Sequence, residues 1–508
     1  MDYEHIQCHG EGLTLPREFA ERMRLMLGVD FPAFCASYAK DIHPSLRVNT
    51  LRLTAERLRE IAPFAGEVIP WQENGFYYAA DGETRPGKHP LHEAGAYYIQ
   101  EASAMLPASL CPPVPGERVL DLCAAPGGKA TQLAAALCGE GLLVANEIHP
   151  TRAGILSQNM ERMGVRNAVV TNATPAELSK KFPAFFDRIV VDAPCSGEGM
   201  FRKEADAVTM WSPENVSLCA DRQAEILDEA AKMLRAGGYL TYSTCTFAPA
   251  ENEGAVLDFL SRHPELEVVP SAALAVVESR EKGLLDGGRP EWAEGYEQYS
   301  AELLEQIKHA LRVFPHHCDG EGHFAVLMHK KEDGGEVAFS VKDSKKKSRK
   351  PEKSNGSKGK PASETVAMGL FEDFCREVMG RIPAWTADTV PCLFGDKLYL
   401  APKALCGESA PTEAMKGVRV LRAGLCAGSI VGLDRGKGRF EPDHALALAG
   451  GCRGFDVDYD SAVAYLKGET LPCDLRGWHT VTYCGLALGW GKASDGVMKN
   501  HYPKGLRW

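Results

Sequence analysis

Short apolar runs alternate with longer amphipathic segments through the middle of the chain. Runs with the length of buried strands occupy residues 118–122, 142–146, 168–171, 188–191 and 239–243. Apolar residues recur at helical spacing over residues 130–138, 151–163, 215–234 and 251–262. A closing pair of strands is expected at residues 313–316 and 324–328. The alternation predicts an α/β, Rossmann-like, mostly parallel sheet covered on both faces, and such sheets bind ligands beyond the carboxyl ends of their strands.

Two breaks in composition divide the chain. Residues 111–116, rich in proline, separate an N-terminal region, 1–112, from the predicted sheet, 113–330. Residues 331–365 contain few apolar residues and many Lys, Ser, Gly and Pro, which is typical of a disordered linker. Beyond the linker, residues 366–508 are predicted to form a compact β-rich appendage, because short glycine-bounded apolar runs occur at residues 397–400, 417–421 and 480–483.

A sharp turn follows the first predicted strand. It consists of Cys123, Ala124, Ala125, Pro126, Gly127, Gly128 and Lys129. The turn is not a P-loop, since Ala130 stands where Ser or Thr would bind magnesium, and it lacks the G-x-G-x-x-G pattern that holds a pyrophosphate. Small residues at a bend suit a cofactor whose tail is an amino acid. Glu147 follows the next strand, where a carboxylate either binds ribose hydroxyls or stabilises a helix start, and the adjacent turn favours the ribose role.

Cysteines occur in the turns after the fourth and fifth predicted strands. Cys195 follows Asp192-Ala193-Pro194, and Cys245 follows Ser243-Thr244, so both should line one crevice. A thiolate that adds to carbon 6 of cytosine makes carbon 5 nucleophilic, and a base must then remove the carbon 5 proton so that the thiolate leaves. Asp192 can accept a hydrogen bond from the cytosine amino group or hold a protonated ring nitrogen. The two turns favour covalent catalysis over buried thiols, without indicating which cysteine attacks.

Composition and charge limit the location and the partners. The chain has 44% hydrophobic and 25% charged residues, which is ordinary for a globular protein. No apolar run approaches the roughly 18 residues that span a bilayer, and the first residues are polar, so we expect a cytoplasmic protein without membrane contact. The 16 cysteines form no C-x-x-C pair, so no metal site is expected. The net charge is −11, but residues 342–360 are strongly basic and can contact RNA phosphates.

Several segments carry a resemblance to a known family. They are LRVNTLR (46–52), YIQEAS (98–103), LCAAPGGK (122–129), DAPCSG with FRK (192–203), STC (243–245) and the tail LGWGK to KNHYPKGLR (488–507). Together these segments closely resemble the Nol/Nop/Sun family of RNA cytosine-5 methyltransferases, in particular its bacterial RsmF (YebU) type, which acts on small-subunit ribosomal RNA. The resemblance covers nearly the whole chain.

The resemblance implies a cofactor and a division of roles. It implies S-adenosyl-L-methionine (SAM), held by the 123–129 turn, Glu147 and Asp192. It makes Cys245 the nucleophile and gives Cys195 the breakdown of the adduct. The expected partner is ribosomal RNA or the small ribosomal subunit, and the protein is expected to act as a monomer.

The resemblance also implies the flanking domains and shows two departures. It implies an α+β RNA-binding region at the N-terminus and a PUA-like RNA-binding domain at the C-terminus. Where relatives carry an Asp near the adenine, this chain has Thr174 with Asn172 close by, and either can hydrogen-bond the adenine edge. Where relatives often have a second aromatic residue, this chain has His323, which is expected to pack and not to catalyse.

Other functions account for part of the pattern. A Rossmann dehydrogenase would use Glu147 in the same way, but it needs the glycine fingerprint and leaves Asp192 and Cys195 without a role. A catalytically inactive RNA-binding factor for ribosome assembly would be expected to have lost one of the two cysteines, and both are present. Formation of 5-methylcytosine in transfer RNA is the alternative within the same chemistry.

Overall fold

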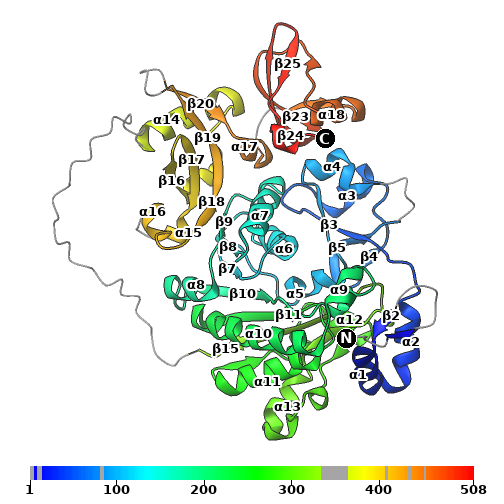
Figure 1. The fold of residues 1–508 in the computed structure, drawn as a ribbon. Helices are drawn as coiled ribbons and strands as arrows, with labels where there is room; N and C mark the ends of the chain where they lie inside the picture. Colours follow the sequence, from blue (N-terminus) through cyan, green and yellow to red (C-terminus); the bar gives the residue numbers. More distant parts are fainter. Residues whose placement is uncertain are drawn as a thin grey trace, which may run out of the picture.

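The computed structural model describes residues 5–7, 14–79, 85–332, 364–406, 410–432, 438–450 and 454–508. Most of the predicted linker therefore lies outside the described residues. The described chain forms a central mixed sheet, an N-terminal region with a small sheet of its own, and two further sheets near the C-terminus (Figure 1). None of the described helices is long and apolar enough to cross a membrane.

The central sheet has ten strands in the described chain. Its parallel part runs in the order β9 (Ala168–Thr171), β8 (Leu142–Asn146), β7 (Arg118–Asp121), β10 (Phe186–Asp192) and β11 (Leu234–Thr244). Of the predicted closing pair, the second strand is confirmed as β15 (His323–Lys330), which lies antiparallel beside β11. The first, β14 (Leu311–Val313), pairs with β15 but ends at Val313, where the predicted strand over residues 313–316 begins. The chain moves outward from β7 to β9 and then returns to β10, so the strand order reverses between β7 and β10, where α/β sheets bind ligands.

Alternate side chains of the parallel strands enter two separate hydrophobic cores. In β8, Leu143 and Ala145 belong to one core, whereas Leu142 and Val144 belong to the other. The first core includes residues of α6 (Gly128–Ala136) and α7 (Pro150–Arg162). The second includes residues of α8 (Pro175–Lys181), α10 (Pro213–Met233) and α11 (Glu253–Arg262). Helices therefore cover both faces, as the continuous apolar runs predict.

β11 begins earlier than predicted. The sequence suggests that the preceding helix ends at Gly237-Gly238 and that the strand starts at Tyr239, but α10 leads directly into a strand that starts at Leu234. The register between β10 and β11 shifts near the two glycines, which therefore lie in an irregular part of the strand. Gly237 has a φ of +72°, which glycine adopts without steric cost. In the sequence, Gly237 and Gly238 suggest a turn. In the structure, they permit a bulged stretch of strand.

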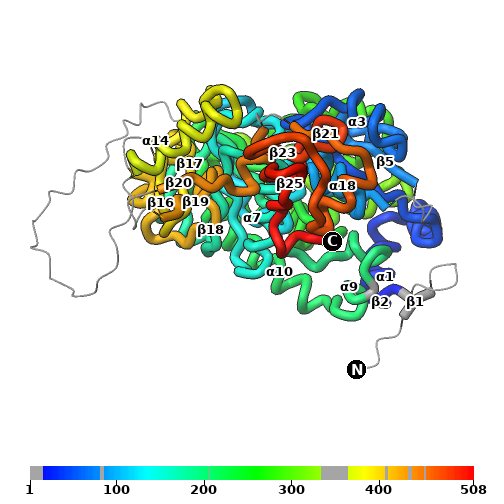
Figure 2. Tube along the Cα trace, turned by 90° about the horizontal axis from the view of Figure 1, so that it is seen from above, coloured from blue at the N-terminus to red at the C-terminus, as the bar shows by residue number. Residues whose placement is uncertain are grey.

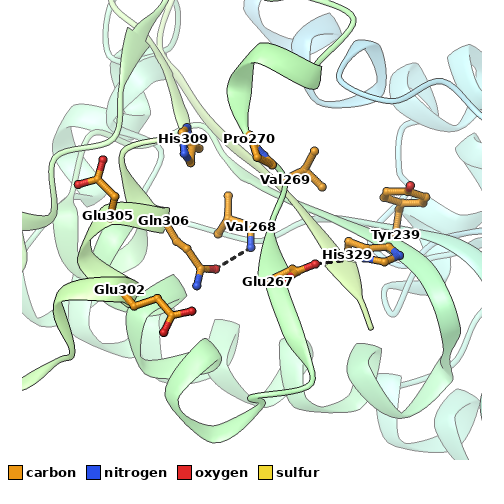
Figure 3. A pocket seen from close by; sticks show the side chains of 10 residues that line it. All are labelled: Tyr239, Glu267, Val268, Val269, Pro270, Glu302, Glu305, Gln306, His309 and His329. Carbon is orange, nitrogen blue, oxygen red and sulfur yellow. Dashed lines mark hydrogen bonds and ion pairs between the residues drawn. The ribbon is translucent and has the colours of Figure 1, made fainter. Parts of the chain in front are cut away.

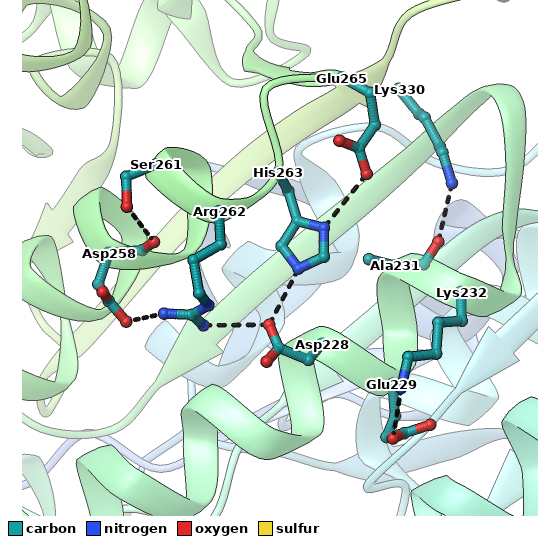
Figure 4. A network of polar contacts seen from close by, with 10 residues as sticks. All are labelled: Asp228, Glu229, Ala231, Lys232, Asp258, Ser261, Arg262, His263, Glu265 and Lys330. Carbon is teal, nitrogen blue, oxygen red and sulfur yellow. Dashed lines mark hydrogen bonds and ion pairs between the residues drawn. The ribbon is translucent and has the colours of Figure 1, made fainter.

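Polar contacts join the helices on the outer side of this part of the sheet (Figure 4). Asp228 of α10 accepts a hydrogen bond from Arg262 Nη2 of α11 at 3.0 Å and lies 2.9 Å from His263 Nε2. Lys330, at the end of β15, donates to the carbonyl of Ala231 at 2.9 Å. These contacts link α10, α11 and β15.

The N-terminal region is fastened to α6 by a buried arginine. The region contains α1 (Arg17–Leu27), α2 (Phe31–Ser37), α3 (Ala55–Ile61) and a sheet of β4 (Val68–Ile69), β5 (Gln72–Tyr77), β3 (Ser45–Val48) and β6 (Tyr97–Ile99). Arg47 of β3 is 2% exposed and donates to Gln100 Oε1 at 3.1 Å. It also donates to the Gly128 carbonyl at 3.0 Å and to Thr131 Oγ1 at 2.8 Å, both in α6.

The prediction of a compact C-terminal appendage is wrong in one respect. β18 (Val420–Ala423) pairs antiparallel with β9 and forms an edge of the central sheet. A separate four-stranded sheet contains β16 (Thr389–Phe394), β17 (Lys397–Pro402), β19 (Leu425–Val431) and β20 (Arg439–Pro442). The pairing of β18 is made by backbone groups, which leave no side-chain pattern in the sequence that identifies the partner strand.

The last sheet packs against the N-terminal region. It contains β21 (Gly454–Val457), β23 (Gly477–Tyr483), β24 (Leu486–Ser494), β25 (Val497–Asn500) and β22 (Leu471–Pro472), with α18 (Tyr459–Leu466). Figure 1 and Figure 2 both show this unit beside the N-terminal helices and strands. Tyr502 Oη donates to Glu93 at 3.1 Å, and Arg52 Nη2 donates to the carbonyl of Ala487 in β24 at 3.4 Å. The last sheet and the N-terminal region are therefore in direct contact.

We expect Arg47→Leu to destabilise the fold by at least about 3 kcal/mol, because three buried acceptors lose a donor and each costs about 1–3 kcal/mol when left unsatisfied. The midpoint of thermal unfolding, followed by circular dichroism, measures the effect. Arg57→Leu is the matched control, since Arg57 is an exposed residue of the same region that pairs with Glu60, and its loss should change the midpoint little. Equal midpoints for the two variants would contradict the prediction.

Candidate active site

The carboxyl ends of four parallel strands meet where the strand order reverses. β10 pairs with β7 on one side and with β11 on the other, and Asp192 at its end lies opposite Ser243. The turns that follow β7, β10 and β11 contain the residues that the sequence singles out. Because parallel strands place their carboxyl ends at one edge, these turns border one crevice.

The two strand-end cysteines contact each other. The Sγ atoms of Cys195 and Cys245 are 3.2 Å apart, and both residues are half-buried. The turns also interlock, since the Gly199 amide donates to the Cys245 carbonyl at 2.9 Å. A Cβ atom on Gly199 would lie 2.6 Å from the Gly322 carbonyl oxygen, so the turns can approach this closely only with glycine at that position. The structure therefore brings the two predicted cysteines together.

The contact between the two sulfurs affects the ionisation of Cys195. Contact with Cys245, and then burial, raises the pKa of Cys195 well above its ordinary value. Cys195 therefore keeps its proton near neutral pH and can donate it in a hydrogen bond to the sulfur of Cys245. An S–H donor at this distance stabilises a thiolate on the accepting sulfur. Either sulfur can donate in this contact, and the protonated Cys195 supplies one such donor.

Asp192 is held by groups on three elements. Oδ1 accepts a hydrogen bond from Ser243 Oγ at 2.8 Å, and Oδ2 accepts one from Lys129 Nζ at 2.7 Å. His323 Nε2 approaches Oδ1 to 3.5 Å. Burial raises the pKa of Asp192, but the charge of Lys129 and the contacts with His323 outweigh it and leave the pKa well below its ordinary value. Asp192 is therefore ionised at neutral pH and acts as a hydrogen-bond acceptor.

His323 is buried as predicted, but its surroundings are those of the active site. It begins β15, is 3% exposed and lies against Asp192. Burial lowers the pKa of His323, so the ring is neutral at neutral pH. The antiparallel register of β15 with β11 places Phe324 opposite Thr244 and so brings His323 to the strand end. The sequence predicts the closing strand but not this register.

The turn after β7 is held by hydrogen bonds to its backbone. The Ala124 amide donates to the Asn146 carbonyl of β8 at 2.8 Å. The Ala125 carbonyl accepts from Arg152 at 2.8 Å, and the Pro126 carbonyl accepts from Asn159 of α7 at 2.8 Å. The backbone of the turn is thus fixed to neighbouring elements, and its small side chains border the crevice.

Two glycines end this turn and lead into α6. Gly127 has a φ of +121°, a conformation that other residues rarely adopt. A Cβ atom on Gly128 would lie 3.2 Å from the side chain of Gln100, which belongs to the N-terminal region. Burial raises the pKa of Cys123, at the start of the turn, far above its ordinary value, so this thiol is neutral and unreactive.

Carboxylates end the two strands beside the turn. Glu147, after β8, is 3% exposed, and its Oε1 accepts a hydrogen bond from the His149 amide at 2.8 Å. Its Oε2 lies 3.5 Å from Arg152 Nη1. Asp121, at the end of β7, is fully buried, and burial followed by the charge of Asp192 raises its pKa to about 8. The sequence analysis identified Glu147 but missed Asp121, which belongs to the predicted buried strand.

Asn172 and Thr174 follow β9 and take part in local structure. Asn172 Nδ2 donates to the carbonyls of Glu147 and Ile148, each at 2.8 Å. The Thr174 hydroxyl caps α8 by donating to Glu177 Oε2 at 2.9 Å and accepting from the Glu177 amide at 3.2 Å. Both residues are half-buried, and Asn172 contacts Glu147. Their contact with an adenine ring stays a prediction.

The sequence analysis also missed two buried polar residues before α11. It predicted a helix over residues 251–262, but α11 begins at Glu253, and a short 3-10 turn, Pro249–Glu251, precedes it. Glu251 and Asn252 are fully buried and contact the turns that contain the two cysteines. An acidic segment ahead of an apolar run is typical of a solvated helix start, so its burial is visible only in the folded chain.

A cavity of about 640 Å³ lies elsewhere, between β12 (Leu266–Val268) and α13 (Ala301–Ile307) (Figure 3). Its lining includes Glu267, Gln306 and His329. His329 lies at the opposite end of β15 from His323, a separation of about 20 Å along the strand. This cavity is therefore distinct from the cysteine crevice. Among the described residues, no group of three His, Cys, Asp or Glu side chains is placed to hold a metal ion.

Four family models match consecutive parts of the chain. The model of the 16S rRNA methyltransferase RsmB/F matches residues 108–329, and that of the N-terminal domain of RsmF matches residues 15–102. The first C-terminal domain of RsmF rRNA methyltransferase matches residues 373–449, and the RsmF PUA domain matches residues 452–508. The RsmB/F match contains both cysteine turns and the turn after β7.

Curated relatives match over almost their full length. Ribosomal RNA small subunit methyltransferase F of Klebsiella pneumoniae is 32% identical over 97% of this chain and 96% of its own. The protein of that name from Vibrio vulnificus is 32% identical over 97% of each chain.

Solved structures share the fold. A methyltransferase homolog protein from Pyrococcus horikoshii is 27% identical, with a TM-score of 0.52 over 62% of this chain and 94% of that one. NSun6 from the same organism is 20% identical, with a TM-score of 0.51 over 63% of this chain and 99% of that one, which shows the fold alone. With the Rossmann-like fold and the full-length relatives established, the chain belongs to the RsmB/F family of SAM-dependent 16S rRNA methyltransferases.

Proposed function

We propose that the protein methylates carbon 5 of cytosine in 16S ribosomal RNA through a covalent adduct with Cys245. The observation that carries the proposal is the 3.2 Å contact between Cys195 and Cys245 at the ends of β10 and β11. Methylation of an amino group or a hydroxyl needs no thiol, whereas methylation at carbon 5 needs a nucleophile for carbon 6 and a base for the carbon 5 proton. Two thiols in one crevice supply both groups.

The reaction follows from the different states of the two sulfurs. Cys245 attacks carbon 6 as a thiolate, forming a sulfur–carbon bond and moving an electron pair toward carbon 5, which then takes the methyl group. When a base removes the carbon 5 proton, the electron pair of the broken C–H bond restores the ring double bond, and Cys245 leaves as a thiolate. Adduct formation removes the contact that contributes most to the raised pKa of Cys195. Cys195 can then lose its proton to solvent and accept the one from carbon 5.

Asp192 binds the cytosine edge in this proposal. Because its pKa is low, the carboxylate is ionised and accepts a hydrogen bond from the amino group or from a protonated ring nitrogen. Lys129 and Ser243 hold the carboxylate, so little reorganisation is needed when charge develops on the ring.

The residues around the turn after β7 fit SAM, which supplies an electrophilic methyl group when bound. We propose that residues 123–129 contact its amino acid tail and that Glu147 binds its ribose. Glu147 is buried beside this turn, where a carboxylate can accept hydrogen bonds from ribose hydroxyls. Asn172 and Thr174 are the candidates for the adenine edge, and Asp192 borders both the cofactor and the base.

Several finer expectations belong to the same proposal. We propose a monomer that acts in the cytoplasm on ribosomal RNA or the small subunit, without a metal ion. We also propose the domain limits 1–112, 113–330, 331–365 and 366–508. An inactive assembly factor, or an enzyme that acts on transfer RNA, remains the alternative. Transfer of tritiated methyl groups from SAM to deproteinised ribosomal or transfer RNA, followed by bisulfite mapping, distinguishes these functions.

We expect Cys245→Ala to abolish methylation while SAM binding survives, because the thiol contacts the base and not the cofactor. Methyl transfer is measured with labelled SAM, and SAM affinity by calorimetry. Cys138→Ala is the control, since Cys138 is an exposed thiol and its loss should preserve activity. Full activity of Cys245→Ala would assign the attack to Cys195 instead.

We expect Glu147→Ala to weaken SAM binding by about 1.5–3 kcal/mol, the usual contribution of a hydrogen bond to a charged group. Calorimetry measures the change. Glu140→Ala, at the opposite end of β8, removes an exposed carboxylate and should leave the affinity unchanged. If both variants bind SAM with the affinity of the original protein, Glu147 does not bind the ribose and only stabilises the start of the helix that follows it.

We expect Cys195→Ala to trap the covalent adduct. Attack by Cys245 and methyl transfer still take place in this variant, but removal of the carbon 5 proton does not, so the RNA stays bonded to the protein. A denaturing gel should show an RNA-dependent band shift that SAM increases. Adding Cys245→Ala should remove the shift, because no bond forms without the nucleophile. Normal turnover without an adduct would show that Cys195 is a packed thiol.

A further inference from the structure

Three consecutive polar residues at the start of α11 are completely buried. Glu251, Asn252 and Glu253 each have 0% exposure. Burying a charged or amide side chain costs free energy unless hydrogen bonds replace its water, so each should have specific partners. The partners of the first two lie in the turns that contain the cysteines.

Glu251 holds the residues on both sides of Cys195. It contacts Ser196 directly and is linked to Pro194 through Gln223. Its Oε2 accepts hydrogen bonds from the Ser196 amide at 3.0 Å and from Gln223 Nε2 at 2.8 Å. Its Oε1 accepts a hydrogen bond from the Ser196 hydroxyl. Gln223 also donates to the Pro194 carbonyl at 3.0 Å. The residues before and after Cys195 are thus fixed by one small network.

Asn252 holds the turn of Cys245 in the same way. Its Oδ1 accepts a hydrogen bond from Thr244 Oγ1 at 2.6 Å, and its Nδ2 donates to the Thr246 carbonyl at 2.9 Å. Thr246 Oγ1 also lies 2.8 Å from Ser196 Oγ, which joins the two turns. Adjacent residues of one chain segment therefore bracket the two cysteines separately.

We propose that Glu251 and Asn252 are positioning residues that set the placement of the two thiols, with Glu251 serving adduct release and Asn252 serving attack. The inference rests on the proposed covalent mechanism. The division of roles follows from the hydrogen bonds, because Glu251 and Asn252 hold different turns. Loss of the Glu251 contacts frees the turn of Cys195 while Asn252 still holds the turn of Cys245. Misplacement of a reacting group by about 1 Å can slow a step about 100-fold, so such anchors affect the rate strongly.

The proposal includes a dependence on pH. Burial, and then the charge of Glu198, raises the pKa of Glu251 to about 7. The groups that face it are Glu198, which pairs with Arg22, and the neutral Cys195, Cys219 and Tyr242. Above pH 7 the ionised carboxylate accepts all three hydrogen bonds. As the pH falls through 7 it gains a proton, loses acceptor capacity and releases the turn of Cys195.

Two labels separate the steps in single-turnover experiments. RNA made with cytosine tritiated at carbon 5 releases tritium to water when that proton is removed, and labelled SAM reports methyl transfer. In Glu251→Gln we expect methyl transfer to persist, tritium release to fall at least about tenfold, and the adduct to appear on a denaturing gel. The original protein should show an inflection of tritium release near pH 7 that Glu251→Gln lacks. In Asn252→Ala we expect both labels to fall together without an adduct.

Two further variants guard against a general loss of structure. Glu253→Gln is the matched control, because Glu253 is equally buried but binds Arg312 at 2.8 Å and the Arg289 amide at 3.1 Å, neither of which is adjacent to a cysteine in the chain. It should lower the thermal midpoint without changing the ratio of tritium release to methyl transfer. If Glu251→Gln does not fold, Ser196→Ala removes the hydroxyl that contacts Glu251 and Thr246 but keeps the Ser196 amide, and it should shift the ratio in the same direction.

An unchanged ratio in both Glu251→Gln and Ser196→Ala would overturn the inference. An equal change of the ratio in Glu253→Gln would also overturn it, because the effect would then belong to packing in general. Failure of the underlying mechanism looks different, since Cys245→Ala would then keep methylating and Cys195→Ala would trap no adduct. A changed ratio in Glu251→Gln, with Glu253→Gln unchanged, supports the assignment.

Discussion

The parallel pairing of β10 with β11 is the constraint on which the site depends. The two strands end side by side, so the turns that contain Cys195 and Cys245 leave the sheet at one edge and their sulfurs meet. A register shift of one residue would turn alternate side chains to the other face and separate Asp192 from Ser243. The irregular pairing lies at the beginning of β11, and the strand ends that bear the functional residues pair regularly.

The pKa values of two buried acids in this region shift in opposite directions because their partners differ. Asp192 has Lys129 at 2.7 Å, and its pKa falls below the ordinary value. Glu251 receives hydrogen bonds from neutral groups and has another carboxylate nearby, so its pKa rises. Desolvation raises the pKa of any acid, and a close cation is needed to reverse that effect. One region therefore holds a permanently charged acceptor and a carboxyl that titrates near neutrality.

The sequence predicts those parts of the site that depend on local pattern and general topology. The parallel strands appear as apolar runs because both of their faces are buried, and parallel order then places the turns of Cys123, Cys195 and Cys245 at one edge. The position of β18 depends on backbone pairing with a distant segment, so no pattern reveals it. His323 and Glu251 gain their surroundings from the register of β15 and from Gln223 of α10, which are tertiary contacts. Gly237 and Gly238 lead to a wrong prediction for the start of β11, because glycine is favoured in turns and in bulges alike.

The contribution of β18 has a consequence for synthesis on the ribosome. β9 is complete in the nascent chain long before the strand that covers its outer side emerges. Until then its backbone amides and carbonyls form an open edge, and such edges recruit strands from other chains. Domains that fold as they emerge are exposed to misassembly in this interval. A gene fragment that ends after the catalytic domain would preserve every residue of the crevice and still yield a protein prone to aggregate.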